Sequence, residues 1–280
     1  MADDFSDSAL LLVAHGSTQN TDSAKPAHQH VDELRARRLF AEVRIGFIKQ
    51  QPEIGAVLQG IKVGRIYVVP LFISEGYYTE EVLPRELGLL TDDDGAFTPT
   101  RQTGEQTLHY CDPIGTHSSM TDALLARAAG VVEQHPFPHR PPTRETTLFL
   151  AGHGTPRNEN SRTAVEQQAA LIRARHLYAE VHAVFLEEEP RVESCYERAA
   201  TRNIVIVPFF ISDGLHTRED IPVKLGEPEK RVQQRLTNGQ PTWVNPTERQ
   251  GKRVWYSASI GTEPFVAEVI LERVREAASG

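Results

Sequence analysis

Three side chains in the second half of the chain have types and positions that could bind a metal ion. His153 follows one apolar run, Glu187 follows a second, and His216 lies in the turn after a third. Two neutral imidazoles and a carboxylate suit a borderline divalent ion such as Fe²⁺, Co²⁺, Ni²⁺ or Zn²⁺. These three residues are therefore the candidates for a catalytic, metal-binding site.

Each candidate has a counterpart in the first half, because the chain contains an internal repeat. Ala14-His15-Gly16 aligns with Gly152-His153-Gly154 at an offset of 138 residues (153 minus 15). At the same offset, segment 67–84 matches segment 205–222 at nine of eighteen positions. A repeat of about domain length indicates the tandem duplication of one domain. We therefore expect two similar domains.

Two of the three candidate metal ligands are replaced in the first repeat. The positions of His153, Glu187 and His216 are occupied in the first half by His15, Lys49 and Tyr78. An ammonium group repels a cation, and a neutral phenol is a poor metal ligand at pH 7. We therefore predict one active site, in the second domain, and a degenerate site in the first.

Apolar runs alternate with helical patterns along both halves. Continuous runs of this kind are typical of strands buried on both faces of a parallel sheet. In such sheets ligands bind beyond the carboxyl ends of the strands, where the candidates lie. The pattern predicts an α/β fold with two parallel sheets. The expected strands are 9–14, 42–48, 65–73, 108–110, 147–151, 180–186, 203–211 and 254–257.

The remaining segments divide the chain and connect the strands. A Pro-rich stretch at 135–142 cannot continue a helix and reads as a linker, so we place the domains at residues 1–138 and 139–280. Segments 91–105 and 226–249 are expected to be surface loops, and 190–200 a helix.

Composition narrows the class of protein. The chain has 280 residues, 39% hydrophobic and 24% charged, and no apolar run approaches the ~20 residues of a membrane span. Its first residues lack the pattern of a signal peptide, so we expect a cytoplasmic protein that is not bound to a membrane. A net charge of −8 argues against nucleic acid as a partner. Cys111 and Cys195 form no paired motif, which predicts two buried thiols and no iron–sulfur cluster.

The motifs resemble a known enzyme family. An apolar strand ending in His-Gly is followed by Phe185-Leu-Glu187 and then by Val207-Pro-Phe-Phe-Ile-Ser-Asp-Gly-Leu-His-Thr-Arg-Glu-Asp-Ile-Pro222. This order is similar to the CbiX/SirB group of class II tetrapyrrole chelatases, in their two-lobed form. The resemblance implies two flavodoxin-like, chelatase-like domains. It also implies a chain that inserts a divalent metal into sirohydrochlorin.

The resemblance assigns roles to the candidates. By motif, the two histidines and the glutamate of the family fall on His153, His216 and Glu187. The metal ion and sirohydrochlorin are then substrates, and no organic cofactor is implied. A monomer is expected, because the duplication can supply both lobes.

Metal insertion requires a site that binds the ion and releases it again. Two imidazoles leave coordination positions open for pyrrole nitrogens, and Glu187 could accept the protons that the macrocycle loses. The carboxylates of the substrate need donors. The expected donors are Gly154, Thr155, Arg157, Ser212, Gly214 and Arg218, with Arg162 and Lys224 as further possibilities.

Several alternatives stay open on sequence alone. The ligand set does not distinguish the metals; we favour ferrous iron, giving siroheme, over a cobalt chelatase of cobalamin synthesis or a nickel chelatase. A non-catalytic metal carrier would keep the histidines but would have no need of Glu187. A histidine phosphatase would have Arg before the histidine, where this chain has Ala14 and Gly152.

Overall fold

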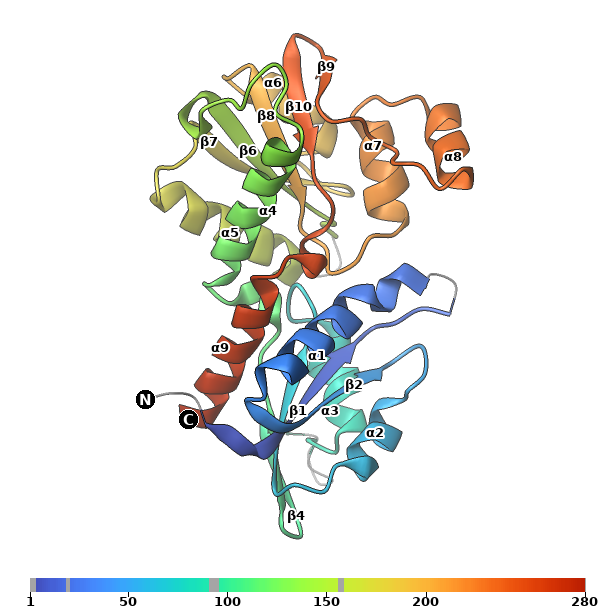
Figure 1. The fold of residues 1–280 in the computed structure, drawn as a ribbon, viewed down its shortest axis with the longest axis vertical. Coiled ribbons are helices and arrows are strands. Elements are labelled where there is room, and N and C mark those ends of the chain that lie inside the picture. Colours follow the sequence, from blue (N-terminus) through green and yellow to red (C-terminus); the bar gives the residue numbers. More distant parts are fainter. Residues whose placement is uncertain (1–3, 19–20, 91–95, 156–158, 280) are drawn as a thin grey trace. The chain divides into compact units, whose positions relative to one another are not determined.

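The computed structural model describes residues 4–18, 21–90, 96–155 and 159–279. These residues form two compact units (Figure 1). Unit 1 contains the chain up to residue 119 together with the stretch from 264 onward, and unit 2 contains residues 120–263.

Each unit is built on a five-stranded sheet, and the two sheets have the same topology. Their strand orders are β2-β1-β3-β5-β4 and β7-β6-β8-β10-β9. Four strands of each sheet run parallel, and the edge strand pairs antiparallel with its neighbour. The strands are β1 (Phe5–Ala14), β2 (Phe40–Phe47), β3 (Arg65–Pro70), β4 (Thr100–Thr103), β5 (Gln106–Tyr110), β6 (Thr146–Gly152), β7 (Glu180–Phe185), β8 (Asn203–Pro208), β9 (Thr247–Arg249) and β10 (Lys252–Tyr256).

The central strands are buried on both faces, as their apolar runs predict. Leu10, Leu11 and Leu12 of β1 are fully buried, and so are Phe149 and Leu150 of β6. Successive side chains of a strand point to opposite faces, so burial of consecutive residues requires cover on both sides of the sheet. The prediction of two duplicated α/β domains with mainly parallel sheets is confirmed.

Nine α-helices within the described residues accompany the sheets. They are α1 (Lys25–Arg37), α2 (Ile54–Gly60), α3 (Leu83–Glu86), α4 (Met120–Gln134), α5 (Asn160–Ala174), α6 (Cys195–Arg198), α7 (Ile221–Lys224), α8 (Glu229–Thr237) and α9 (Val266–Ser279). No helix in this described part of the chain is long and apolar enough to cross a membrane.

The last helix of each repeat belongs to the other repeat's unit. Helix α4, from the end of the first repeat, packs against β8 and α5 in unit 2. Helix α9, from the end of the second repeat, packs against β3 and α1 in unit 1 (Figure 1). The compact units therefore cross the boundary expected at residue 138, and the division into residues 1–138 and 139–280 stays a prediction about the duplicated sequence.

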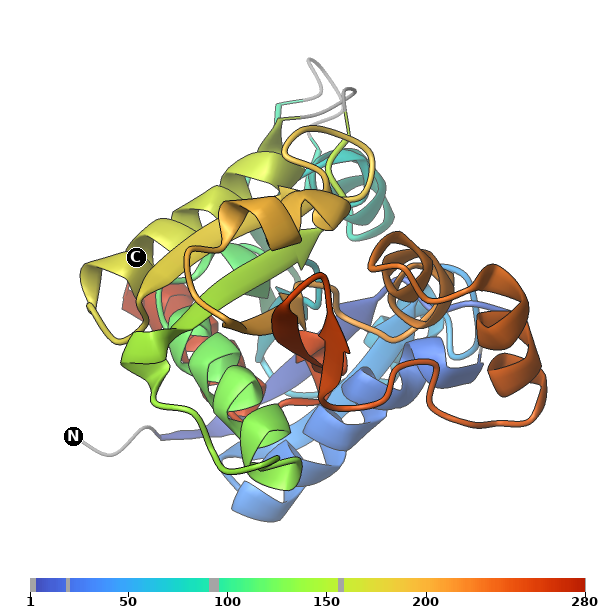
Figure 2. The same cartoon turned by 90° about the horizontal axis from the view of Figure 1, so that it is seen from above.

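Two segments expected to be loops contain regular structure. Segment 91–105 includes β4, and segment 226–249 includes β9 and α8, which lies beside α7 (Figures 1 and 2). Helix α8 forms because Val232 is fully buried and the buried Glu227 pairs with Arg249 at 3.0 Å. In segment 190–200 the expected helix is only a short turn followed by α6. Both cysteines are buried free thiols, as expected.

Candidate metal centre

The three candidate ligands follow three neighbouring parallel strands of unit 2. His153 comes directly after β6, and Glu187 follows the end of β7 by two residues. His216 begins η6 (His216–Asp220), a π-helical turn after β8. Turns of this type are rare and occur frequently at functional sites. Because parallel strands end at one edge of a sheet, the three side chains are brought together.

Distances within the group show how close the side chains lie. The imidazole rings of His153 and His216 meet edge to face, with centroids 4.8 Å apart and an angle of 78°. Glu187 Oε1 lies 3.6 Å from His153 Nε2. The amide N–H of Glu187 donates to the carbonyl of His153 at 3.0 Å, which holds the two residues side by side. The sequence-predicted trio is thus adjacent in space.

Hydrogen bonds indicate which nitrogen of each histidine could face a metal. His153 Nδ1 lies 2.7 Å from the carbonyl oxygen of Gly154. His216 Nδ1 lies 2.6 Å from a carboxylate oxygen of Asp220. A carbonyl and an ionised carboxylate only accept, so Nδ1 carries the hydrogen in both rings. Each neutral ring then presents the lone pair of Nε2, the form in which imidazole binds metals.

Asp220 is a further candidate for the site, and it is not among the residues predicted from the sequence. It stands four residues after His216, a spacing that places two side chains on one face of a helix. A carboxylate that holds the far nitrogen of a ligating histidine orients the ring and raises its basicity. The sequence does contain a signal for this pair. His216 and Asp220 are four residues apart, and the first repeat replaces both of them, with Tyr78 and Val82.

Hydrogen bonds of Thr217 hold the turn that carries His216. The Gly214 amide donates to Thr217 Oγ1 at 3.0 Å, and the Tyr256 hydroxyl donates to the Thr217 carbonyl at 2.7 Å. Burial raises the pKa of Tyr256, so this hydroxyl keeps its hydrogen and its bond. A fixed Thr217 in turn fixes the backbone of the neighbouring His216.

Gly154 is required by the turn that follows His153. Its φ of +63° lies in the left-handed region, which residues other than glycine rarely adopt. A Cβ there would also lie 2.6 Å from Glu188 Oε1 and 2.9 Å from Phe185 Cβ. Gly154 therefore shapes this turn, and its predicted contact with the substrate stays a prediction.

The side chains of the candidate centre are open to solvent. His153, His216 and Glu187 have 34%, 46% and 51% of their side-chain surface exposed. No group of three or more His, Cys, Asp or Glu within the described residues is arranged to hold a metal ion as it stands. An ion between these side chains would need them to rotate, or would need further ligands. Their assignment as metal ligands therefore stays a prediction.

A cavity of about 350 Å³ adjoins two of the candidates. Its walls carry more acids than bases, and Lys224 in its lining pairs with Glu193 at 3.5 Å. A carboxylate-rich wall favours the approach of a cation. The lining residues are Leu186, Glu187, His216, Glu219, Asp220, Val223, Lys224 and Glu229.

Several of the expected substrate donors already have partners. Arg162 pairs with Glu166 at 2.9 Å and with Glu188 at 3.1 Å, and it lies over the ring of Phe185. The Gly214 amide is occupied by the bond described above. Thr155 and Arg218 also make interactions within the chain.

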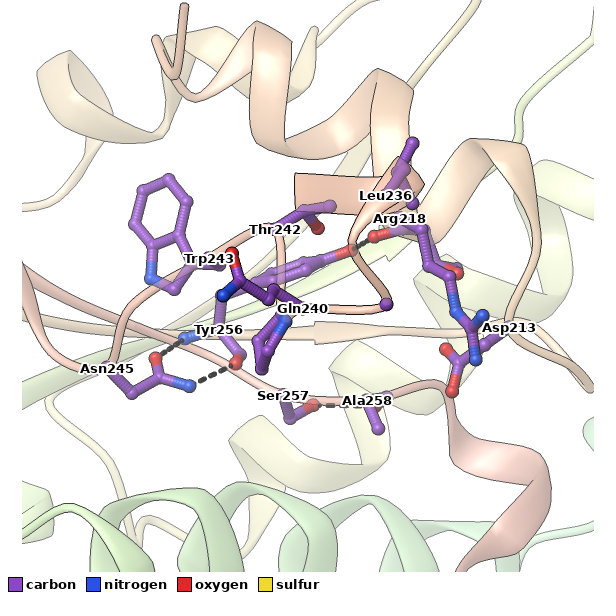
Figure 3. Close-up of a pocket in the computed structure, with 13 residues that line it drawn as sticks. Asp213, Arg218, Leu236, Gln240, Thr242, Trp243, Asn245, Tyr256, Ser257 and Ala258 are labelled. Atoms are coloured by element: carbon purple, nitrogen blue, oxygen red, sulfur yellow. Dashed lines mark hydrogen bonds between the residues drawn. The ribbon is translucent and has the colours of Figure 1, made fainter. Parts of the chain in front are cut away.

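Ser212, Arg157 and Arg218 complete the expected set. Ser212 is partly exposed in the turn after β8. Arg157 lies outside the described residues. Arg218 points toward Asp213 at the wall of a second cavity, of about 400 Å³, which the segment from Leu236 to Asn245 helps to enclose (Figure 3). This cavity does not include His153, Glu187 or His216 in its lining.

Fold and site together define a class of protein. The chain is a duplicated α/β protein that presents histidines and carboxylates beyond the carboxyl ends of a parallel sheet. The CbiX family model matches residues 9–131 and 147–277, one match for each repeat. The chain belongs to the CbiX family, which confirms the resemblance inferred from its motifs.

Curated relatives match either the whole chain or one repeat. A probable sirohydrochlorin cobaltochelatase of Halobacterium salinarum is 42% identical, over 96% of this chain and 91% of the relative. A sirohydrochlorin cobaltochelatase of Methanopyrus kandleri is 32% identical over 138 residues, which cover 46% of this chain and 95% of the relative. The second relative therefore corresponds in length to a single repeat.

Solved structures share the fold. A multi-domain protein of Deinococcus radiodurans with structural similarity to chelatases has a TM-score of 0.76 and 29% identity. The match covers 96% of this chain but 55% of that protein, so the chain spans about half its length. SirB from Bacillus subtilis with Fe³⁺ has a TM-score of 0.67 and 23% identity, over 97% and 96% of the two chains. This second likeness shows the fold alone.

Proposed function

We propose that this protein is a sirohydrochlorin chelatase, which inserts a divalent metal ion into the macrocycle at the carboxyl edge of the second sheet. The observation that carries the proposal is the convergence of His153, Glu187 and His216, which come from three separate segments. The full-length relative with 42% identity supports the choice of substrate.

The arrangement supports different roles for the two histidines and for Glu187. The Nε2 atoms of His153 and His216 bind the incoming ion and leave its other positions open for pyrrole nitrogens. Two N–H protons must leave the macrocycle as the metal enters. Glu187 is our candidate to accept one of them. Its carboxylate lies 3.6 Å from His153 Nε2, the atom that would bind the metal, so it would be close to the pyrrole nitrogens that replace their protons with the metal. With 51% of its side chain exposed, it can pass that proton to water and accept the second.

We favour cobalt as the metal, because the named relatives are cobaltochelatases. Ferrous iron, which is favoured on sequence alone, is not named in the description of either relative. The ligand chemistry accepts Co²⁺, Fe²⁺ and Ni²⁺ alike, since all three bind imidazole and carboxylate. Iron and nickel are therefore alternatives for the same site.

Anaerobic incubation of the purified protein with sirohydrochlorin and one metal at a time tests the proposal. The absorption spectrum changes when the metal enters the ring. We expect insertion to be faster than without protein, and fastest with Co²⁺. His153→Ala and His216→Ala should each reduce the rate at least about 100-fold, because each removes a ligand. Insertion at the uncatalysed rate with all three metals would rule the function out.

A further inference from the structure

Arg162, in the first turn of α5, contacts the turn that carries Glu187. Its Nη1 donates to a carboxylate oxygen of Glu188 at 3.1 Å and to the carbonyl of Glu189 at 2.9 Å. Its guanidinium lies 5.1 Å from the ring centroid of Phe185, the last residue of β7. One side chain of a neighbouring helix therefore contacts the end of β7 and both residues that follow Glu187.

Glu188 connects this contact to His153. The side chain of Glu188 lies against Gly154, since a Cβ on that glycine would be 2.7 Å from Glu188 Cγ and 2.6 Å from Glu188 Oε1. The carbonyl of Gly154 is the group that accepts from His153 Nδ1 at 2.7 Å. Arg162 is thus connected through Glu188 to the turn that orients His153, and through the backbone to Glu187.

The Glu188 carboxylate needs the positive charge of Arg162. The side chain of Glu188 is 20% exposed, and its Oε1 is buried with no hydrogen-bond partner among the described residues. A largely buried carboxylate that loses its counter-charge is destabilised, and we expect it to turn toward water. The turn that carries Glu187 and covers Gly154 would then lose its fixed position.

This ion pair is specific to the repeat that has the predicted metal ligands. Ala24 and Gln50 stand at the positions of Arg162 and Glu188 in the first repeat. Gln50 Oε1 accepts from the Ser17 amide at 2.9 Å, so a neutral contact with the backbone holds the corresponding turn. The fold of the repeat therefore forms without the ion pair, which indicates a role for Arg162 at the site.

We propose that Arg162 is a positioning residue, which holds Glu187 and His153 at the spacing that a metal ion requires. This inference rests on the proposed function, because it gives Arg162 a part in metal binding and insertion. The sequence also allows Arg162 to be a donor to the carboxylates of the substrate. Its Nε and Nη1, however, already donate to three groups within the chain.

Calorimetric titration of the protein with Co²⁺ tests the positioning role, because the sign of the effect is informative. Removing a cation beside the site leaves the site more negative, so a purely electrostatic effect would strengthen Co²⁺ binding. Loss of the correct spacing would instead weaken binding, and we expect Arg162→Met to lower the affinity for Co²⁺ about tenfold. Arg162→Lys keeps the charge and should retain more of the affinity. Unchanged or stronger binding in Arg162→Met would overturn the proposal.

The matched control is Arg202→Met. Arg202 is an exposed arginine of the same unit, and it pairs with Glu248 at 3.2 Å. It directly precedes β8, at the opposite end of that strand from the turn that carries His216. We expect this variant to bind Co²⁺ as the wild type does, because the lost ion pair is remote from the site.

Titration of the metal-free protein with sirohydrochlorin separates positioning from substrate binding. Arg162→Met should keep the dissociation constant for sirohydrochlorin within about twofold of the wild-type value, while kcat falls about tenfold. A donor to the substrate would behave differently. Affinity for sirohydrochlorin that falls about tenfold or more, with unchanged affinity for Co²⁺, would identify Arg162 as such a donor and overturn the proposal.

A double-mutant cycle checks that the effect passes through Glu188. Glu188→Gln introduces the side chain that the first repeat has at this position, and Arg162→Met should have a smaller further effect on Co²⁺ affinity in that background. Additive losses would show that the two residues act independently, against the proposal. A wild-type protein that binds Co²⁺ and sirohydrochlorin but inserts no metal would instead overturn the proposed function, and the Co²⁺ titrations would still decide the role of Arg162.

Discussion

Asp220 and His216 illustrate how a single neighbour can define what a histidine does. The 2.6 Å contact leaves Nε2 as the atom that faces a ligand and limits rotation of the ring. Val82 cannot do this in the first repeat. The contact with Asp220 therefore orients the ring of His216, and the Tyr78–Val82 pair of the first repeat has no equivalent contact between a ring nitrogen and a carboxylate.

Replacing Asp220 should weaken metal binding without unfolding the protein. Asp220→Leu removes the acceptor, and we expect the affinity for Co²⁺ to fall roughly 10- to 100-fold. Asp220→Asn keeps an acceptor oxygen and should lose less. Calorimetric titration with Co²⁺ measures both, and Glu197→Gln, an exposed acid of the same unit, is the control. Equal affinity in Asp220→Leu and the wild type would show that the pair is only a surface contact.

Glu187 distinguishes a chelatase from a protein that merely carries metal. Glu187→Gln keeps the size of the side chain and removes its basic oxygen. If Glu187 accepts the pyrrole protons, turnover should fall about 100-fold or more while metal affinity changes little. Stopped-flow absorbance with saturating Co²⁺ and sirohydrochlorin measures the rate. Recovery of the rate at higher metal concentration would identify Glu187 as a ligand instead, and a near-normal rate throughout would remove it from the mechanism.

At the scale of elements, the segment between α7 and β10 shows how polar contacts can order a stretch of chain that has few apolar residues. Glu227 is 5% exposed and pairs with Arg249 at 3.0 Å, with Arg231 and Arg235 at 3.8 and 3.9 Å. Arg249 also lies over the ring of Trp243. These contacts hold α8 and β9 in place, although the segment is short of apolar residues.

Removing the buried carboxylate should loosen this segment. Glu227→Gln leaves the guanidinium of Arg249 without its counter-charge, and loss of one partner of a buried pair costs about 3 kcal/mol. We expect amide hydrogen exchange in α8 and β9 to become roughly 100-fold faster, with little change in β6 or β7. Lys230→Gln, an exposed change in α8, is the comparison. Equally faster exchange throughout unit 2 would mean that the ion pairs of Glu227 stabilise the whole unit and not only α8 and β9.

At the scale of the whole molecule, the exchange of α4 and α9 makes each unit depend on chain from both repeats. Helix α9 buries its apolar face in unit 1. Arg273, with a side chain only 7% exposed, donates two hydrogen bonds to the Pro113 carbonyl at 3.1 and 2.8 Å. A buried guanidinium satisfied in this way holds the helix strongly.

Truncation tests the exchange. A chain ending at Glu263 lacks α9 and should expose the core of unit 1, even though the deleted residues belong to the second repeat. Limited proteolysis with mass spectrometry should show cleavage concentrated before residue 119, with residues 120–263 more resistant. A chain ending at Ala278 should behave as the wild type. Cleavage concentrated between residues 139 and 263 would contradict the exchange. The expected monomer and the cytoplasmic location are separate predictions, which truncation does not address.

The amino-acid sequence by itself determined the fold class, the duplication and the position of the candidate chemistry. Continuous apolar runs specify buried parallel strands, and parallel strands end at one edge of their sheet. His153, Glu187 and His216 each follow such a run. Their convergence could therefore be predicted before any distance was known.

Only the tertiary structure decided which neighbours these residues have. The π-helical turn sets the contact between His216 and Asp220, and the choice of tautomer follows from that contact. The exchange of α4 and α9 was beyond the sequence, because an amphipathic pattern shows that a helix needs an apolar partner but not which sheet supplies it. The order in α8 was missed for a related reason: the ion pairs of Glu227 join residues that are distant in the chain, and such contacts leave no periodic signal.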